Sequence, residues 1–234
     1  MNVLVTRPHE DAAHTAARLA RLGHAACVSP VSLILPSGAG PASLRHDAVV
    51  ATSANAFRLA SPELLGSLGD KRIFTVGDHT AAEARGCGLT RVTSAGADQR
   101  ALSALIQASL PAGSRLLYLA GRDRKPGLEA GLRNAGMTVE TVEIYHAENA
   151  PCLTREAQAL LASGQIRAVL HYSNAAAAGF TALAEAAGLT RAARALRHCC
   201  ISADAAAPLR RAAFPGVEIA AHPDESSLLS LLQS

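Results

Sequence analysis

The sequence repeats one pattern of segments, in the same order, in its two halves. Three pairs of segments match: 3–31 with 116–145, 48–57 with 168–177, and 73–107 with 199–233. Any two strand–turn–helix units share part of this pattern, but the common order of all three pairs favours a duplication. A duplicated α/β unit predicts two similar lobes, and two lobes predict a cleft for a ligand.

Short runs of β-branched residues alternate with helices rich in Ala, Leu and Arg. This alternation predicts an α/β fold of two doubly wound lobes, each with a mainly parallel sheet and helices on both faces. Asp98 and Asp224 are expected to be helix N-caps, because an apolar helical stripe follows each of them. The expected strands are 2–6, 25–29, 47–51, 72–76, 90–93, 115–119, 138–143, 167–171, 198–202 and 217–220.

Two stretches read as connectors between the lobes. Ile34–Pro41 is rich in Pro and Gly, and Tyr145–Pro151 follows an expected strand and ends at a proline. If both are linkers, the N-terminal unit joins the C-terminal third of the chain. The predicted boundaries are 1–34 with 150–234 for lobe one, 39–144 for lobe two, and 35–38 and 145–149 for the linkers.

Composition limits the class of ligand. Of the 234 residues, 3% are aromatic and none is Trp, which disfavours modules that stack nucleic-acid bases on exposed rings. The net charge of +3 is mild and permits an anionic small molecule. No apolar run reaches the roughly 18 residues of a membrane span, and the start of the chain does not read as a signal peptide. We therefore expect neither a nucleic-acid nor a membrane partner.

The five cysteines are odd in number and show no CxxC spacing. They read as small core residues in a reducing compartment, and not as a disulfide framework or a metal site. Cys199 and Cys200 are adjacent on an expected strand, so they should point to opposite faces of the sheet. These features favour a cytoplasmic location.

Polar residues gather in the turns that follow five expected strands. In doubly wound sheets, ligands bind beyond the carboxyl ends of the strands. Hydroxyl groups and free amides at helix N-termini bind carboxylate or phosphate. A single Ser or Thr is better explained as an ordinary N-cap, but the set together favours an anion-lined cleft. The candidate binding residues in these turns are Thr6, Arg7, Thr52, Ser53, Asn55, Gly77, His79, Thr80, Ser173, Asn174 and Ser202.

Two further features could contact an anion or move a proton. Gly121–Lys125 follows a strand and opens a helix, and its two Arg and one Lys could hold carboxylates or could simply be solvated. Gly121 and Arg122 are therefore further candidates. Tyr145 ends a strand beside a connector, where its phenol could donate a proton or could pack across the hinge.

Several common catalytic patterns are missing from the sequence. There is no GxGxxG after a strand, no GxSxG and no HExxH. These absences disfavour a dinucleotide, a serine-hydrolase elbow and a zinc site. We expect no cofactor and no metal, and a cleft that binds a polyanion.

Together these segments resemble the uroporphyrinogen-III synthase family over nearly the whole chain. The likeness rests on seven short motifs, which are 4–8, 50–56, 76–81, 119–125, 142–146, 172–174 and 223–229. It implies two α/β lobes joined by a two-stranded linker. It also implies that the chain is a cyclising lyase of heme biosynthesis, which converts the linear hydroxymethylbilane to uroporphyrinogen III with inversion of ring D. In that reaction ring A loses water to give an azafulvene, and ring D attacks it through a spiro intermediate.

The resemblance also implies roles for individual residues. Tyr145 matches a tyrosine that assists loss of the hydroxyl group, and Thr80 matches a functional threonine of the Gly-x-x-Thr-Ala turn. The second copy of that turn, Ser202–Ala206, lacks the Gly and the Thr. An anionic Asp204 there would oppose binding of a polycarboxylate unless it points away, which leaves that turn in doubt.

Two other classes of protein remain open from the residues. A non-catalytic, two-lobed binding module for an anionic metabolite would bind tightly and form no product. A nucleotide-dependent transferase is disfavoured, because no phosphate loop occurs. For the enzyme, the expected partner is a linear tetrapyrrole polycarboxylate. We expect a monomer that makes at most a transient contact with the preceding enzyme of the pathway.

Overall fold

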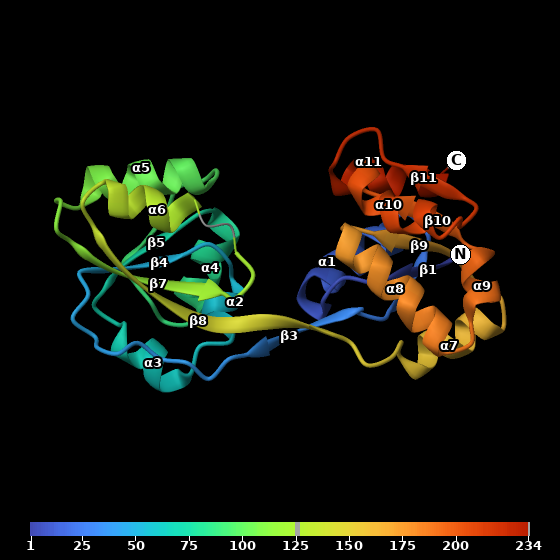
Figure 1. The fold of residues 1–234 in the computed structure, drawn as a ribbon, viewed down its shortest axis with the longest axis horizontal. Helices are drawn as coiled ribbons and strands as arrows, with labels where there is room; N and C mark the ends of the chain where they lie inside the picture. The colour runs from blue at the N-terminus through green and yellow to red at the C-terminus, as the bar shows by residue number, and fades with distance from the viewer. Residues whose placement is uncertain (125–126, 234) are drawn as a thin grey trace. The chain divides into compact units, whose positions relative to one another are not determined.

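The computed structural model describes residues 1–124 and 127–233. Its chain divides into two compact units. Unit 1 consists of Met1–Leu33 and Glu148–Ser234, and unit 2 is the continuous segment Ile34–Ala147 (Figure 1). Among the described residues, no helix is long and apolar enough to cross a membrane.

Unit 1 is built on a five-stranded parallel sheet with the order β11-β10-β9-β1-β2. Apolar clusters cover both faces: α7 to α10 supply residues to one, and α1, α11 and η1 supply residues to the other. The strands are β1 (Asn2–Val5), β2 (Ala25–Val28), β9 (Ile166–His171), β10 (Arg197–Cys200) and β11 (Val217–Ile219). The helices are α1 (His9–Arg21), α7 (Arg155–Ala162), α8 (Asn174–Ala186), α9 (Thr190–Arg194), α10 (Ala203–Arg211), α11 (Glu225–Ser230) and η1 (Leu231–Gln233).

Unit 2 is built on a six-stranded sheet with the order β3-β8-β7-β4-β5-β6. Residues of α2, α3 and α4 pack on one face and residues of α5 and α6 on the other. The strands are β3 (Ser32–Pro36), β4 (Ala48–Ala51), β5 (Arg72–Thr75), β6 (Val92–Ser94), β7 (Arg115–Gly121) and β8 (Thr138–Asn149). The helices are α2 (Asn55–Arg58), α3 (Pro62–Ser67), α4 (Asp78–Gly86), α5 (Gln99–Ser109) and α6 (Gly127–Asn134).

Segments that match in the sequence occupy the same places in the two sheets. The order β2-β1-β9-β10-β11 in one unit corresponds to β8-β7-β4-β5-β6 in the other. A single side-chain contact also recurs. Arg72, the first residue of β5, donates to Ser109 O at the end of α5 at 2.8 Å. Its counterpart Arg197, the first residue of β10, donates to Leu231 O just after α11 at 2.6 Å. The mainly parallel α/β fold with helices on both faces is therefore as expected.

Strands extend into both stretches that the sequence analysis read as connectors, whereas residues 37–41 form no regular secondary structure. These strand segments were not among the expected strands, although the family resemblance implied a two-stranded linker. β8 continues past the expected end at 143 to Asn149, and the unexpected β3 lies beside it at the edge of the sheet. Ser37 N donates to Ile144 O and Ala150 N donates to Val31 O, so the two segments run in opposite directions. Pro36 is compatible with a strand because it sits at the end of an edge strand, where no donor is required.

Three local predictions are confirmed. The Asp98 carboxylate accepts hydrogen bonds from Arg100 N and Ala101 N at the start of α5, and Asp224 accepts one from Ser227 N at the start of α11. Cys199 and Cys200 contribute to the apolar clusters on opposite faces of the five-stranded sheet. All five cysteines are free thiols.

Candidate active site

A cavity of about 660 Å³ lies in unit 2 at the carboxyl edge of its sheet. It brings together residues that follow β4, β5 and β7, Tyr145 of β8, and the first residues of α5. Four of the predicted site residues line it: Thr52, Ser53, Gly121 and Tyr145. The other lining residues are Val76, Asp98, Gln99, Arg100, Asp123 and Arg124.

The ring of Tyr145 lies directly on the backbone of Gly121. The register of β7 and β8 shifts between Ala120 and Gly121, so that Gly121 pairs with Tyr145. A Cβ at Gly121 would come within 2.7 Å of Tyr145 Cε2 and Cζ, so only glycine leaves room for this ring position. In the described part of the chain the Tyr145 hydroxyl makes no hydrogen bond, which leaves it available to a ligand in the cavity.

Thr52, which lines the cavity, forms a hydroxyl pair with Tyr118. The Thr52 Oγ1 and Tyr118 OH atoms are 2.9 Å apart, and the Tyr118 side chain is fully buried. Burial raises the pKa of Tyr118, only partly opposed by the bond to Thr52, so the phenol stays neutral and can donate. When Tyr118 donates, the Thr52 hydroxyl proton is free to donate to a ligand.

The loop that begins at Gly121 is held by ion pairs. Arg124 lies 3.0 Å from Glu143 Oε1 and 3.4 Å from Glu129 Oε1, and it donates to Gly121 O at 3.0 Å. Although desolvation opposes it, the bonds to these carboxylates raise the pKa of Arg124. Its charge is therefore largely matched within the protein.

Arg122 keeps more freedom than Arg124. Its side chain is 57% exposed, and its guanidinium lies 3.7 Å from Glu143, a long and weak pair. Arg122 does not line the cavity. Lys125, the third cation expected in this loop, lies outside the described residues.

The remaining candidates of unit 2 lie near the same edge but outside the cavity. Gly77 precedes α4 without a side-chain cap, and Asn55 begins α2, where its N–H donates to Ser53 Oγ at 3.3 Å. His79 is exposed and lies 3.4 Å from Arg58. Thr80 is 5% exposed, and its hydroxyl makes no hydrogen bond in the described part of the chain.

In unit 1 the first two candidates already have protein partners. The Thr6 side chain is buried and donates to Leu170 O at 2.9 Å, so it joins β1 to β9. Arg7 lies 3.3 Å from Glu225 and 3.0 Å from Asp11, and its guanidinium stacks 4.2 Å from the centre of the Tyr172 ring. These contacts give both residues a structural role.

Glu225 is the centre of a polar cluster that sequence reasoning missed. It accepts hydrogen bonds from Thr15, from Tyr172 OH at 2.7 Å and from Arg18 at 2.8 Å. Burial opposes ionisation, but these hydrogen bonds prevail and lower the pKa of Glu225. Its partners lie 53 to 218 residues away along the chain, so nothing local in the sequence points to them.

The other candidates of unit 1 act as helix caps. Ser173 accepts from Ala176 N at 3.1 Å, and Ser202 accepts from Ala205 N at 3.2 Å. The Asn174 amide donates to Asp204 O at 3.0 Å, which ties the start of α8 to the start of α10. The alternative reading as ordinary N-caps therefore describes what these hydroxyls do in the free protein.

The cavity residues that were not among the named candidates come from three places, one of which is Val76 after β5. Asp123 and Arg124 belong to the loop after β7, which had been singled out as a whole. Asp98, Gln99 and Arg100 begin α5, and the only available signal was the N-cap pattern at Asp98. Among the described residues, no group of three or more His, Cys, Asp or Glu side chains is placed to hold a metal ion.

Comparison with known proteins adds an independent line of evidence. The fold is similar to that of uroporphyrinogen-III synthetase from Helicobacter pylori, with a TM-score of 0.63 and 16% identity over 99% of this chain and 98% of that one. A mutant uroporphyrinogen III synthase from the extremely thermophilic bacterium Thermus thermophilus is also matched, with a TM-score of 0.49 and 16% identity over 100% and 97% of the two chains. No curated protein sequence gives a match. The model of the uroporphyrinogen-III synthase HemD family matches residues 13–230, and the chain belongs to that family.

Proposed function

We propose that this chain cyclises hydroxymethylbilane to uroporphyrinogen III, with inversion of ring D, and that the cavity of unit 2 holds the reacting end of the substrate. Family membership makes the chain a cyclising lyase of tetrapyrrole and heme biosynthesis. The non-catalytic binding module is the weaker alternative, because the family is one of synthases. The position of Tyr145 carries the assignment of the site: its unpartnered hydroxyl lies in a cavity beside Thr52 and Ser53.

The first chemical step suits a weak acid such as a phenol. The hydroxymethyl group of ring A leaves as water, so its oxygen must gain a proton while the C–O bond breaks. The Tyr145 hydroxyl can donate a hydrogen bond to that oxygen, and a pyrrole makes the group reactive enough not to need a stronger acid. The azafulvene that forms is cationic, and ring D then bonds to its exposed carbon.

Ring closure requires the cavity to fix a conformation more than it requires strong acids. The bilane also closes unaided, without inversion, so the protein must exclude that geometry. The substrate bears carboxylates on every ring. Near this edge lie two cations, Arg100 and Arg122, and the backbone amides at the start of α4, which no side chain caps. We propose that they hold these carboxylates, together with Thr80 and His79. The proposal is weaker for candidates that mostly have partners within the protein already, which are Thr6, Arg7, Asn55, Gly77, Ser173, Asn174 and Ser202.

A coupled assay tests both the activity and the role of Tyr145. The enzyme that makes hydroxymethylbilane supplies it in situ. After oxidation of the products to porphyrins, the assay measures the ratio of isomer III, closed with inversion of ring D, to isomer I, closed without inversion. The wild-type chain should form isomer III, and Tyr145→Phe should lower the rate about tenfold, less than the roughly 100-fold or more of a typical general acid, because the reactive hydroxymethyl group needs only weak assistance. Isomer I alone with wild-type protein would reject the enzyme, whereas isomer III at an unchanged rate with Tyr145→Phe would reject only the acid.

Two further properties belong to the same proposal. We propose that the chain acts as a monomer. Because a bilane released into solution would close to the wrong isomer, we also propose that the chain contacts the preceding enzyme, and that this contact is transient. Sedimentation of the chain alone and mixed with that enzyme would detect a stable complex, which is not expected. The five free cysteines, three of them buried, favour the reducing cytoplasm.

A further inference from the structure

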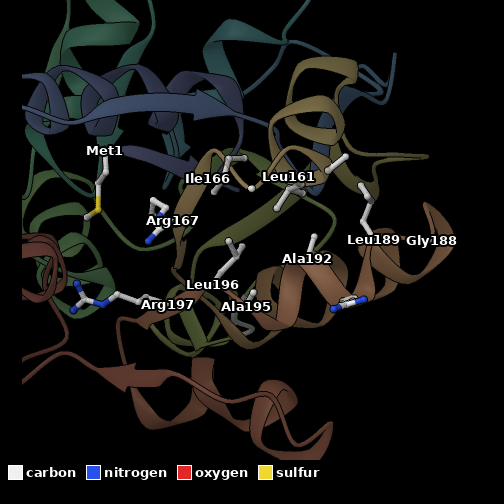
Figure 2. Close-up of a pocket in the computed structure, with 13 residues that line it drawn as sticks. Met1, Leu161, Ile166, Arg167, Gly188, Leu189, Ala192, Ala195, Leu196 and Arg197 are labelled. Atoms are coloured by element: carbon white, nitrogen blue, oxygen red, sulfur yellow. The ribbon is translucent and has the colours of Figure 1, made fainter.

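A cavity of about 760 Å³ in unit 1 has no place in the proposed reaction (Figure 2). It is lined by Met1 before β1, by Ile166 and Arg167 at the start of β9, and by Arg197 at the start of β10. In a parallel sheet these strand starts share one edge. The predicted substrate turns of the unit follow the carboxyl ends of the same strands, so the cavity lies at the opposite edge of the sheet.

The cavity combines an apolar floor with positive charge. Leu161, Ile166 and Leu196 are almost fully buried beneath it, and Leu189 and alanines of α9 extend the apolar wall. Three arginines complete the lining, and among the described residues no acidic side chain lines it. Its volume is within the range of about 300–1,000 Å³ that pockets for small molecules occupy.

Arg197 is the arginine with a structural role. Its guanidinium pairs with both carboxylate oxygens of Glu218, at 2.8 and 2.9 Å, and donates to Leu231 O. The matching residue of unit 2, Arg72, makes the same kind of bond to Ser109 O. This contact therefore belongs to the repeated fold and does not require a ligand.

Arg167 and Arg191 differ from Arg197 in having no partner. Both are exposed, and neither makes a hydrogen bond or an ion pair within the described part of the chain. In the repeat, Arg167 corresponds to Asp47, whose carboxylate accepts from Arg115 N at 2.7 Å and so supports the start of β7. A structural acid in one unit is thus replaced by a free cation in the other.

The matching edge of unit 2 shows that duplication alone does not produce such a pocket. The cavity there contains two acids, Asp47 and Asp70, and its cations are bound to the backbone. Lys71 donates to His46 O, and Arg91 donates to Asp70 O. Of these two cavities, only that of unit 1 combines an apolar floor with guanidiniums that have no partner among the described residues.

We propose that the cavity of unit 1 binds a small amphipathic anion, whose apolar body lies on Leu161, Ile166 and Leu196 and whose carboxylate or sulfonate is held by one of the two unpartnered guanidiniums, that of Arg167 or that of Arg191. Guanidinium groups bind such oxyanions in a bidentate way, and the apolar floor contributes through burial of the ligand's ring or branched chain. This site is separate from the proposed active site and does not depend on it.

Binding of 8-anilinonaphthalene-1-sulfonate to the intact chain tests the proposal, because this probe combines a sulfonate with aromatic rings. The double variant Arg167→Gln/Arg191→Gln should weaken binding at least about fivefold. The matched control Arg210→Gln/Arg211→Gln removes the same charge from exposed positions of α10 and should change affinity less than about twofold. Equal weakening by the two double variants, or no binding by the wild-type chain, would overturn the proposal.

The position of the bound probe decides between this cavity and the active site. In ¹H–¹⁵N spectra, the probe should shift the amides of Gly164, Gly188 and Ala195, which line the cavity. Shifts confined to Thr52 and Gly121 would contradict the assignment. The Arg167→Gln/Arg191→Gln variant should retain formation of isomer III in the coupled assay, so failure of this site and failure of the proposed function are distinguishable.

Discussion

At the residue scale, Gly121 determines where the Tyr145 ring can lie. A methyl group at Gly121 would meet the ring at 2.7 Å, closer than real side chains approach, so Gly121→Ala should displace the phenol from the cavity. Misplacement by about 1 Å can cost up to about 100-fold in rate, and we expect a fall of about tenfold in kcat. Thermal unfolding should show that the variant remains folded.

The matched control for this substitution is Gly86→Ala on α4. A Cβ there meets nothing within 4 Å, and alanine favours a helix, so the rate should stay near that of the wild type. If Gly121 acts through Tyr145, the double variant Gly121→Ala/Tyr145→Phe should be little slower than either single variant. Fully additive losses would show that Gly121 acts in another way.

At the element scale, two buried histidines join β9, β10 and α9. His171 Nε2 lies 3.2 Å from His198 Nδ1, and His198 Nε2 lies 3.0 Å from Ala193 O. Because a carbonyl oxygen only accepts, His198 carries its proton on Nε2 and His171 donates from Nε2. Burial, with a contribution from His198, lowers the pKa of His171 to about 3, and burial lowers the pKa of His198 to about 4.

These lowered pKa values predict loss of stability in mild acid. In the unfolded chain both histidines take up protons near pH 6.5, whereas the folded chain keeps them neutral. The contribution of the two neutral histidines to the free energy of unfolding is therefore complete above about pH 6.5 and is lost as the pH falls toward about 4. For the pair, the free energy of unfolding should fall by about 2 kcal/mol between pH 6.5 and 5.5. Urea unfolding at these pH values measures the loss. When the free energy of unfolding is plotted against pH, His171→Leu should show about half the slope of the wild type. The control His222→Gln, at an exposed position, should show the full slope. Equal slopes for His171→Leu and the wild type would contradict the prediction.

The elements that sequence reasoning placed correctly are those with local signals. Helices with an Asp N-cap appear where expected, because their hydrogen bonds close within a few residues. The buried strands were found from their β-branched apolar runs, although their hydrogen-bond partners lie far away in the chain. β3 and the end of β8 were missed, because each is a strand only by virtue of the other, more than 100 residues away. Their Pro and polar residues resemble a loop, and pairing at the sheet edge overrides that preference.

At the scale of the whole chain, duplication explains what could be foreseen of the candidate site. Parallel strands bring their carboxyl ends to one edge, so the turns at Thr52 and Gly121 were expected together, and they line one cavity with Tyr145. The carboxylates that neutralise the arginines were not foreseen. Glu143 and Glu225 are ordinary surface-type residues in the sequence, and only the folded chain places them against Arg124 and Arg7.

The two units should differ in their ability to fold alone, because one is continuous in the chain and the other is not. Residues 34–147 contain every member of both apolar clusters of the six-stranded sheet, so this fragment should fold cooperatively. Residues 148–234 lack β1, which lies between β9 and β2, together with Leu4 and Leu19 of the two cores. That fragment should stay largely unfolded until a peptide of residues 1–33 is added. Circular dichroism during thermal unfolding checks both fragments. A cooperative transition of 148–234 alone, or none for 34–147, would show that the cores do not divide as their residues indicate.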